Sequence, residues 1–331
     1  MYNYNEVTSM HIELTSKCQA RCPMCPRRIN GGMLNPLFDL EEITLEQFKS
    51  WFSDDFLKQL IYINFCGNLG DPIIAKDTLE IFQYLKTIHP GISLSMHTNG
   101  SAREPKWWEE VAKLDVRVTF GIDGLEDTHH LYRVSTDWNK IITNAKAFIN
   151  AGGRAEWHML VFKHNEHQIE QCRELSKQYN FSSFTIKHTT RFQDGKFHAL
   201  DDSGKTSHIL YPTKLSEEMI AKGYSAAKEE FPIIKCKAKV DKQLYVSSNG
   251  NVSPCCWLDF EWILPKQDSR IDYMDRIGVF PSLRKNSLEE IFNTKFFNQV
   301  ENTWSCNPLM ECSKQCGSFD KLNAQYVEKC K

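Results

Sequence analysis

The sequence lacks the features that mark membrane-spanning, nucleic-acid-binding and secreted proteins. No apolar run approaches the ~20 residues of a membrane-spanning helix, so we expect no membrane span. Neither charge sign is in excess, because 40 Lys and Arg face 42 Asp and Glu, and a formal net charge of −2 disfavours a broad surface for nucleic acid or anionic lipid. We recognise no internal repeat, low-complexity tract or secretory signal peptide.

Cysteine, in contrast, is abundant. The 331 residues include 12 cysteines. Disulfides suit small secreted chains, whereas a chain of this length without a secretory signal is expected in a reducing compartment. The cysteines therefore indicate metal ligation, and we expect the protein to be cytoplasmic.

Short apolar runs alternate with amphipathic stretches over the first ~190 residues. The predicted strands are Met10–Thr15, Leu60–Phe65, Ile92–His97, Val116–Ile122, Ala155–Phe162 and Ser183–His188. The predicted helices are Leu45–Leu57, Asp77–Ile88, Lys106–Lys113, Trp138–Ala151 and His167–Tyr179. Strands that alternate with helices indicate an α/β fold with a parallel sheet. The six units are fewer than the eight of a closed barrel.

The remainder of the chain has a different character. Residues 191–234 are more polar, with a loop predicted where Gly195, Asp201, Asp202, Ser203 and Gly204 cluster, and a bridging helix predicted over Ser216–Phe231. From Cys236 onward, short strands and cysteines dominate, with a hairpin turn at Asn249-Gly250 and one more helix over Ser287–Val300. We therefore expect a first domain at 1–192, a linker at 193–235 and a small cysteine-rich domain at 236–331.

The first cysteine group follows the first predicted strand. Cys18, Cys22 and Cys25 have Cx3Cx2C spacing, and Pro23 and Pro26 discourage a helix there. Three thiolates at this spacing can hold three irons of a 4Fe–4S cluster and leave the fourth iron open. A structural zinc site is the alternative, but it needs four ligands, and no fourth lies nearby.

Three other predicted strands end in polar, glycine-containing motifs. The motifs are Gly67-Asn-Leu-Gly70-Asp71-Pro72, Thr98-Asn99-Gly100 and Asp123-Gly124 with His129, His130 and Arg133 downstream. Glycines at a strand end allow a ligand to approach the backbone, and Asp71 can accept a hydrogen bond from an ammonium group. Ordinary βα turns and a solvated helix start are the alternatives. The carboxyl ends of parallel strands share one face of a sheet, so these motifs should lie beside the cysteine loop.

Over residues 10–190 the order of these motifs resembles the radical S-adenosylmethionine (radical SAM) enzymes. The resemblance implies a partial (βα)6 TIM barrel in which Leu69-Gly70-Asp71-Pro72 replaces the family's Gly-Gly-Glu-Pro-like motif for the SAM amino group. It also implies a radical SAM 4Fe–4S cluster on Cys18, Cys22 and Cys25. The SAM contacts that it implies are Met24, Gly67, Gly70, Asp71, Pro72, Thr98, Asn99, Asp123 and Arg133.

The later cysteines resemble a SPASM domain, which holds auxiliary 4Fe–4S clusters in this family. Six of its seven cysteines are present, and Thr303 stands in place of the seventh. The resemblance assigns Cys236, Cys255 and Cys316 to a first auxiliary cluster, and Cys306, Cys312 and Cys330 to a second. The second cluster then lacks one thiolate, which Glu301, water or substrate could replace, or it is absent. A zinc module of Cys306, Cys312, Cys316 and Cys330 is the alternative.

Cys256 directly follows Cys255 and lies outside the SPASM pattern. It is a candidate hydrogen-atom donor to a substrate radical and a candidate cluster ligand. Because free cysteines are commonly buried, an inert core position is an equal alternative.

The resemblance implies reductive cleavage of SAM to a 5′-deoxyadenosyl radical that abstracts a substrate hydrogen atom. SPASM relatives mostly modify ribosomally made peptides, so we favour oxidation, cross-linking or epimerisation of a peptide or protein. About nine residues precede the first strand, so we expect no separate leader-peptide recognition domain there.

Two alternatives and several partners follow from the same resemblance. Relatives with a shorter, one-cluster domain of the twitch type include dehydrogenases of sugar-like alcohols, which is the alternative function. A non-catalytic metal-binding scaffold is the alternative from another class. The expected partners are a peptide or small-molecule substrate and an electron donor such as flavodoxin or ferredoxin, without membrane or nucleic acid.

Overall fold

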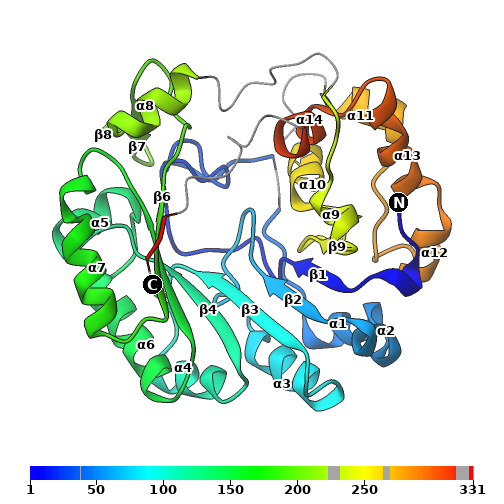
Figure 1. Cartoon of the computed structure of the whole chain (residues 1–331), viewed down its shortest axis with the longest axis horizontal. Coiled ribbons are helices and arrows are strands. Elements are labelled where there is room, and N and C mark those ends of the chain that lie inside the picture. The colour runs from blue at the N-terminus through cyan, green and yellow to red at the C-terminus, as the bar shows by residue number, and fades with distance from the viewer. Residues whose placement is uncertain (38, 223–231, 264–268, 318–327, 331) are drawn as a thin grey trace.

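The computed structural model describes residues 1–331 except 38, 223–231, 264–268, 318–327 and 331. A curved nine-stranded sheet organises the chain, in the order β10-β9-β1-β2-β3-β4-β5-β6-β11 (Figure 1). Its six central strands are all parallel, as predicted. They are β1 (Ser9–Ile12), β2 (Tyr62–Phe65), β3 (Ser93–Thr98), β4 (Val116–Gly121), β5 (Ala155–Leu160) and β6 (Ser183–Lys187). The prediction of a partial α/β barrel is confirmed.

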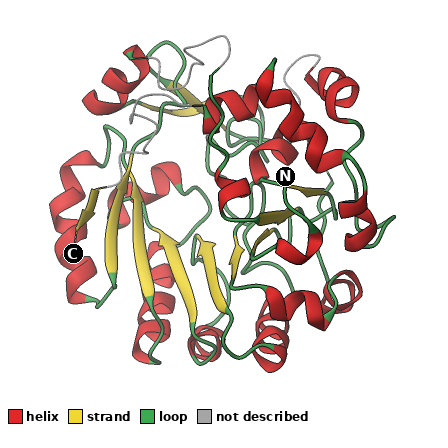
Figure 2. Ribbon diagram, turned by 45° about the vertical axis from the view of Figure 1, so that its right-hand side comes forward, coloured by secondary structure: helices red, strands yellow, loops and turns green. Residues whose placement is uncertain are grey.

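Helices cover the outer side of this sheet (Figure 2). They are α1 (Leu45–Trp51), α2 (Asp54–Gln59), α3 (Thr78–Ile88), α4 (Pro105–Ala112), α5 (Glu126–Tyr132), α6 (Trp138–Asn150) and α7 (Ile169–Gln178), with 3-10 turns η1 (Tyr4–Glu6) and η2 (Glu166–Gln168). The prediction of one helix over Leu45–Leu57 was wrong. Ser53 accepts a hydrogen bond from the Phe56 amide and so starts a second helix.

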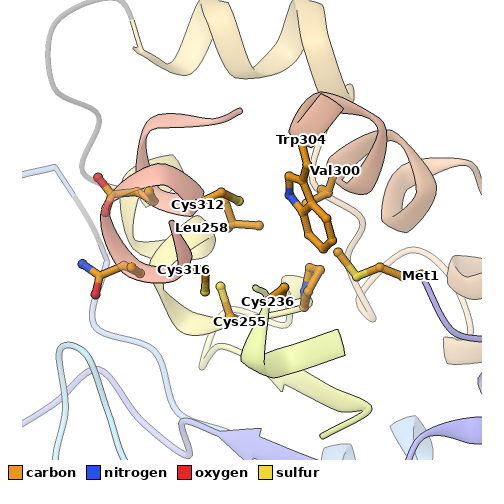
Figure 3. A pocket seen from close by; sticks show the side chains of 11 residues that line it. Met1, Cys236, Cys255, Leu258, Val300, Trp304, Cys312 and Cys316 are labelled. Atoms are coloured by element: carbon orange, nitrogen blue, oxygen red, sulfur yellow. The ribbon is translucent and has the colours of Figure 1, made fainter. Parts of the chain in front are cut away.

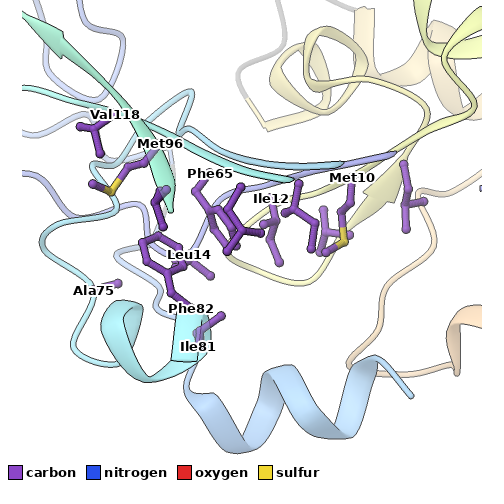
Figure 4. Packing of buried hydrophobic residues seen from close by; sticks show 14 of the residues in the cluster. Met10, Ile12, Leu14, Phe65, Ala75, Ile81, Phe82, Met96 and Val118 are labelled. Atoms are coloured by element: carbon purple, nitrogen blue, oxygen red, sulfur yellow. The ribbon is translucent and has the colours of Figure 1, made fainter. Parts of the chain in front are cut away.

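The main core lies between the sheet and its helices and includes residues from all six central strands. Met10 and Ile12 on β1 belong to the same cluster as Phe65 on β2 and Phe82 on α3 (Figure 4). These residues recur every second position on the strand and every third or fourth position on the helix, which directs them to one interior. This packing fixes the strand ends where the polar motifs begin.

Residues 197–210 differ from the predicted loop, whereas the start of the predicted bridging helix is present as α8 (Lys214–Ala221). Residues 197–210 form the hairpin of β7 (Phe197–Leu200) and β8 (Thr206–Leu210). Asp201 accepts a hydrogen bond from the Ser203 amide and closes the hairpin turn, so the polar cluster marks a turn instead of a long loop. Most of the predicted bridging helix, at 223–231, lies outside the described residues.

The C-terminal part contributes strands to both edges of the main sheet. Its elements are α9 (Lys237–Val240), β9 (Gln243–Val246), β10 (Val252–Ser253), α10 (Cys256–Ile263), α11 (Ser269–Ile277), α12 (Leu288–Asn293), α13 (Phe296–Asn302), η3 (Thr303–Ser305), α14 (Met310–Cys316) and β11 (Glu328–Cys330). The predicted Asn249-Gly250 hairpin turn is present, and β9 pairs in parallel with β1. Helices α10 and α11 were not predicted, and the single helix predicted over Ser287–Val300 is two helices.

Candidate functional site

The first cysteine loop leaves the end of β1 and turns back on itself. The Cys25 amide donates to the Cys22 carbonyl at 3.0 Å, so the loop contains a tight turn and no helix, as its prolines predicted. Met24 lies with Cys22 in a small apolar cluster that includes Tyr132 and Phe162. The loop therefore presents its thiols beside an apolar surface that is suited to an aromatic ring.

The second-strand motif packs directly against this loop. The Asp71 amide donates to the Lys17 carbonyl at 3.0 Å. A Cβ at Gly70 would lie 1.7 Å from the Thr15 carbonyl oxygen, so no side chain fits at this position. Gly70 is required because two backbone segments approach each other here.

Asp71 is buried and connects the second and third strand ends. Its carboxylate accepts from the Thr98 hydroxyl at 2.8 Å, from the Ile73 amide at 3.2 Å and from both the backbone amide and the Nδ2 of Asn99, at 2.8 and 2.6 Å. Burial raises its pKa, while these donors lower it. Four donors fill the roughly four acceptor positions of a carboxylate. Asp71 therefore orients Asn99, whose Nδ2 lies 3.5 Å from the Cys18 thiol.

The fourth-strand motif reaches the same loop from the other side. Arg133 donates from Nε to Asp123 at 2.6 Å, and its guanidinium lies 4.0 Å from the Cys22 thiol. Asp123 also accepts from the Leu160 amide at the end of β5, at 2.6 Å. The His129 ring is buried and accepts from the Asp123 amide at 3.1 Å, and its pKa is lowered to about 3 by burial. His129 therefore positions Asp123 from a buried site, and it is not part of a solvated helix start.

The groups around the three thiols fit a negatively charged cluster. Burial raises the pKa of the Cys22 thiol to about 11, and the nearby Arg133 guanidinium opposes that shift. Arg27 is 3% exposed, lies close enough to Cys18 to lower its pKa, and has a buried Nε without a hydrogen-bond partner among the described residues. Two arginines and an asparagine thus surround the thiols, as the thiolates and sulfides of an iron–sulfur cluster require.

Four of the C-terminal cysteines line one cavity (Figure 3). They are Cys236, Cys255, Cys312 and Cys316. The thiols of Cys236 and Cys316 hydrogen-bond to each other, which raises the pKa of Cys236 and lowers that of Cys316 to about 6. Within the described ranges, no group of three or more His, Cys, Asp and Glu is arranged around a single metal ion.

The structure does not bring the remaining predicted cluster ligands to that cavity. Cys306 is exposed at the end of η3, and the backbone of Cys330 pairs with Phe184 of β6. Glu301, the predicted substitute ligand, forms ion pairs with the N-terminal amine and with Lys239.

Cys256 is half-buried at the start of α10, in a polar group that connects the two cysteine regions. Asn68 of the second-strand motif donates to the Cys256 carbonyl at 3.0 Å and to the Tyr245 hydroxyl at 3.3 Å. Tyr245 donates to Glu13 at 2.5 Å, and burial raises the pKa of Glu13 to about 7. Sequence analysis missed Glu13 and Tyr245, although Glu13 directly follows β1.

Comparisons of sequence agree with this geometry. A profile of the radical SAM superfamily matches residues 12–175, and a profile of the SPASM iron–sulfur cluster-binding domain matches residues 236–317. No curated protein sequence matches the chain. In the part of the chain that the structure describes, we find no helix with the length and apolar character of a membrane span.

Similar solved structures share the fold. Streptococcus suis SuiB bound to S-adenosylmethionine has a TM-score of 0.58 at 12% identity, over 95% of this chain and 71% of SuiB. SuiB bound to the precursor peptide SuiA has a TM-score of 0.58 at 12% identity, over 90% of this chain and 66% of SuiB. The anSMEcpe protein with AdoMet and the Cp18Cys peptide has a TM-score of 0.53 at 16% identity, over 94% of this chain and 88% of anSMEcpe. The cofactors of this chain are SAM and 4Fe–4S clusters. The chain belongs to the radical SAM superfamily and carries a C-terminal SPASM domain.

Proposed function

We propose that the protein modifies a peptide or protein substrate by removing a hydrogen atom from a C–H bond. The observation that carries the proposal is the combination of a radical SAM core with a SPASM domain, in one fold with SuiB and anSMEcpe. SuiB and anSMEcpe have each been solved with a peptide bound. The product is an oxidised, cross-linked or epimerised residue.

The chemistry belongs to the cofactors, and the chain positions them. With SAM and a reduced cluster bound, the site supplies a 5′-deoxyadenosyl radical that takes one hydrogen atom from the substrate, the electron coming from a flavodoxin- or ferredoxin-type donor. Cys18, Cys22 and Cys25 would hold the cluster. Because the Asp71 carboxylate is already filled with donors, we assign contact with the SAM amino group to the backbone carbonyls of the Gly67–Asp71 segment.

We propose Cys256 as the candidate hydrogen-atom donor to the substrate radical. It starts α10, and its thiol is close enough to Cys66 and Glu13 for their charges to raise its pKa, with burial as the larger cause. Asn68 ties its backbone to the second-strand motif. A thiol in this position can return a hydrogen atom to a carbon radical, which is the step that epimerisation needs.

A second candidate is dehydrogenation of a sugar-like alcohol. The four cysteines around one cavity favour it, because one-cluster relatives include such dehydrogenases. In that reaction the substrate loses a hydrogen atom, a proton and one further electron.

The first experiment tests the enzyme activity itself. The full chain, reconstituted anaerobically with iron and sulfide and reduced with dithionite, should convert SAM to 5′-deoxyadenosine. Cys25→Ala should reduce the rate to the background level, because the radical SAM cluster then has two thiolates. The matched control is Cys172→Ala on α7, a buried cysteine far from the loop in sequence, which should retain cleavage. A wild-type rate in Cys25→Ala would contradict the site assignment.

The second experiment separates the two substrate classes. Peptides from short reading frames beside the gene and a panel of amino sugars and polyols are added separately, and 5′-deoxyadenosine formation is followed with product masses. We expect a peptide to stimulate SAM cleavage and to change in mass. If a polyol alone is converted to a ketone, the peptide proposal is wrong and the dehydrogenase replaces it.

A further inference from the structure

We propose that the SPASM domain of this chain holds a single auxiliary 4Fe–4S cluster, with Cys236, Cys255, Cys312 and Cys316 as its four ligands. This assignment moves Cys312 from the second cluster, where the seven-cysteine pattern places it, to the first. It leaves Cys306 and Cys330 outside the metal site. The inference depends on the family of the chain and not on the class of its substrate.

Three separate elements bring the four thiols together. Cys236 precedes α9, Cys255 follows β10, and Cys312 and Cys316 lie on α14. A separation of four residues places Cys312 and Cys316 on one helix face. All four line the same cavity (Figure 3). The number of thiols equals the number of irons in a 4Fe–4S cluster.

The thiols are also close to one another. Cys236 and Cys316 hydrogen-bond through their side chains, and Cys255 interacts electrostatically with each of them. Cys312 interacts in the same way with Cys255 and Cys316. Each thiol therefore has at least two of the others as electrostatic neighbours. As thiolates, these four groups would need a cation beside them, and a cluster would supply the iron.

The cavity wall offers hydrogen-bond donors to the thiols. The backbone amides of Lys237 and Lys239 hydrogen-bond to Cys316 and Cys236, respectively, and those of Trp257 and Leu258 hydrogen-bond to Cys255. The side chain of Trp304 hydrogen-bonds to the Cys312 thiol and opposes the rise that burial causes in the pKa of that thiol. Hydrogen bonds to sulfur and an apolar wall tune such clusters.

The second cluster has no comparable site among the described residues. Thr303, in place of the missing cysteine, is 8% exposed and donates its hydroxyl to the Val300 carbonyl at 2.7 Å. Cys306 is exposed, and the backbone of β11 places Cys330 beside β6, at the opposite edge of the sheet from β9 (Figure 1). The carboxylate of Glu301 is engaged by two cations.

Complete cysteine ligation has a chemical consequence. A cluster held by all four cysteines would have no iron open to a substrate atom, so it would be suited to exchange of electrons with the substrate and not to coordination of the substrate.

The test uses the full chain with Cys18, Cys22 and Cys25 all changed to Ala, so that only auxiliary clusters remain. After anaerobic reconstitution we expect about four irons and four sulfides per chain, and the EPR spectrum of one reduced 4Fe–4S cluster. In this background Cys312→Ala should lose most of the iron or change the EPR spectrum, and Cys312→Ser should restore iron content with altered g-values. Cys306→Ala and Cys330→Ala are the matched controls and should leave both readouts unchanged.

Several results would overturn the proposal. About eight irons in the triple variant would mean two auxiliary clusters. Loss of iron in Cys306→Ala or Cys330→Ala, or an unchanged spectrum in Cys312→Ala, would restore the assignment from the seven-cysteine pattern. Zinc in place of iron after anaerobic purification would mean a structural metal site. Cys312→Ala with the radical SAM cysteines intact serves as the folding control, since it should still bind about four irons there.

Discussion

At the scale of single residues, the clearest departure from ordinary burial is Glu13. Its side chain is 2% exposed and accepts hydrogen bonds from the Tyr245 hydroxyl and the Asn68 amide. Burial raises its pKa from 4.5 to about 7, while the hydrogen bonds from Tyr245 and Asn68 act in the opposite direction. Asp259 lies near enough to interact with it, and its own pKa is raised by burial to about 8. These two acids form a proton-holding group between the sheet and the SPASM domain.

Glu13→Gln should therefore remove a pH dependence of stability. The folded-state pKa lies above the unfolded one, so the stabilisation from the Glu13 proton is fully present below about pH 4.5 and is lost as the pH rises through about 7. The shift corresponds to about 3 kcal/mol. As the pH rises from 5 to 8, we expect the thermal midpoint of the wild type to decrease relative to that of Glu13→Gln.

The exposed Glu46 of α1 provides the control for this measurement, because Glu46→Gln makes the same chemical change at the surface. The difference in thermal midpoint between the wild type and Glu46→Gln should stay constant from pH 5 to pH 8. A constant difference for Glu13→Gln as well would show that Glu13 does not hold its proton in the folded protein.

At the scale of elements, the β9–β10 hairpin depends on one glycine. Gly250 has a φ of +85°, and a Cβ there would lie 3.2 Å from the Trp51 ring and 3.3 Å from Arg284. Gly250→Ala should lower the free energy of unfolding by about 1–2 kcal/mol from the left-handed backbone alone, with a further loss from these contacts. Chemical denaturation followed by circular dichroism measures both parts together.

Gly152→Ala separates the two parts. Gly152 has a φ of +91° and no heavy atom within 4 Å of the position its Cβ would take. Its substitution should cause only the backbone loss, so Gly250→Ala should be the more destabilising of the two. Equal losses would mean that Trp51 and Arg284 move aside without a penalty.

Local sequence patterns predicted most elements of the core but not the breaks inside helices. The six parallel strands are apolar runs bounded by turns, which is a local property. The break at Ser53 depends on a side chain that caps the next helix. The β7–β8 hairpin depends on the polar turn at Asp201–Gly204, which connects its two strands. Both are choices between a hydrogen bond to a side chain and one to the continuing backbone, and apolar periodicity does not report them.

At the scale of the whole molecule, the SPASM domain is part of the main sheet. Strand β9 pairs with β1 residue by residue, with Met10 opposite Leu244. The sequence predicted the β9–β10 hairpin from its turn, but no local pattern identifies a parallel partner more than 200 residues away. The SPASM resemblance assigned Cys236, Cys255 and Cys316 to one cluster, and all three line the second cavity. It assigned Cys312 to the other cluster, because the spacing of the cysteines does not show which distant thiols the fold brings together.

This shared ladder predicts that the core and the start of the SPASM domain open together. Amides of β1 and β9 that pair with each other can exchange with deuterium only when both strands separate, so native-state hydrogen exchange should give them similar opening free energies. The two-stranded β7–β8 sheet pairs with no other strand among the described residues, so its amides should exchange at a lower free energy. If β9 instead exchanged like β7 while β1 stayed protected, the SPASM domain would be a separate folding unit, and its cluster would sit on a body free to move relative to the SAM site.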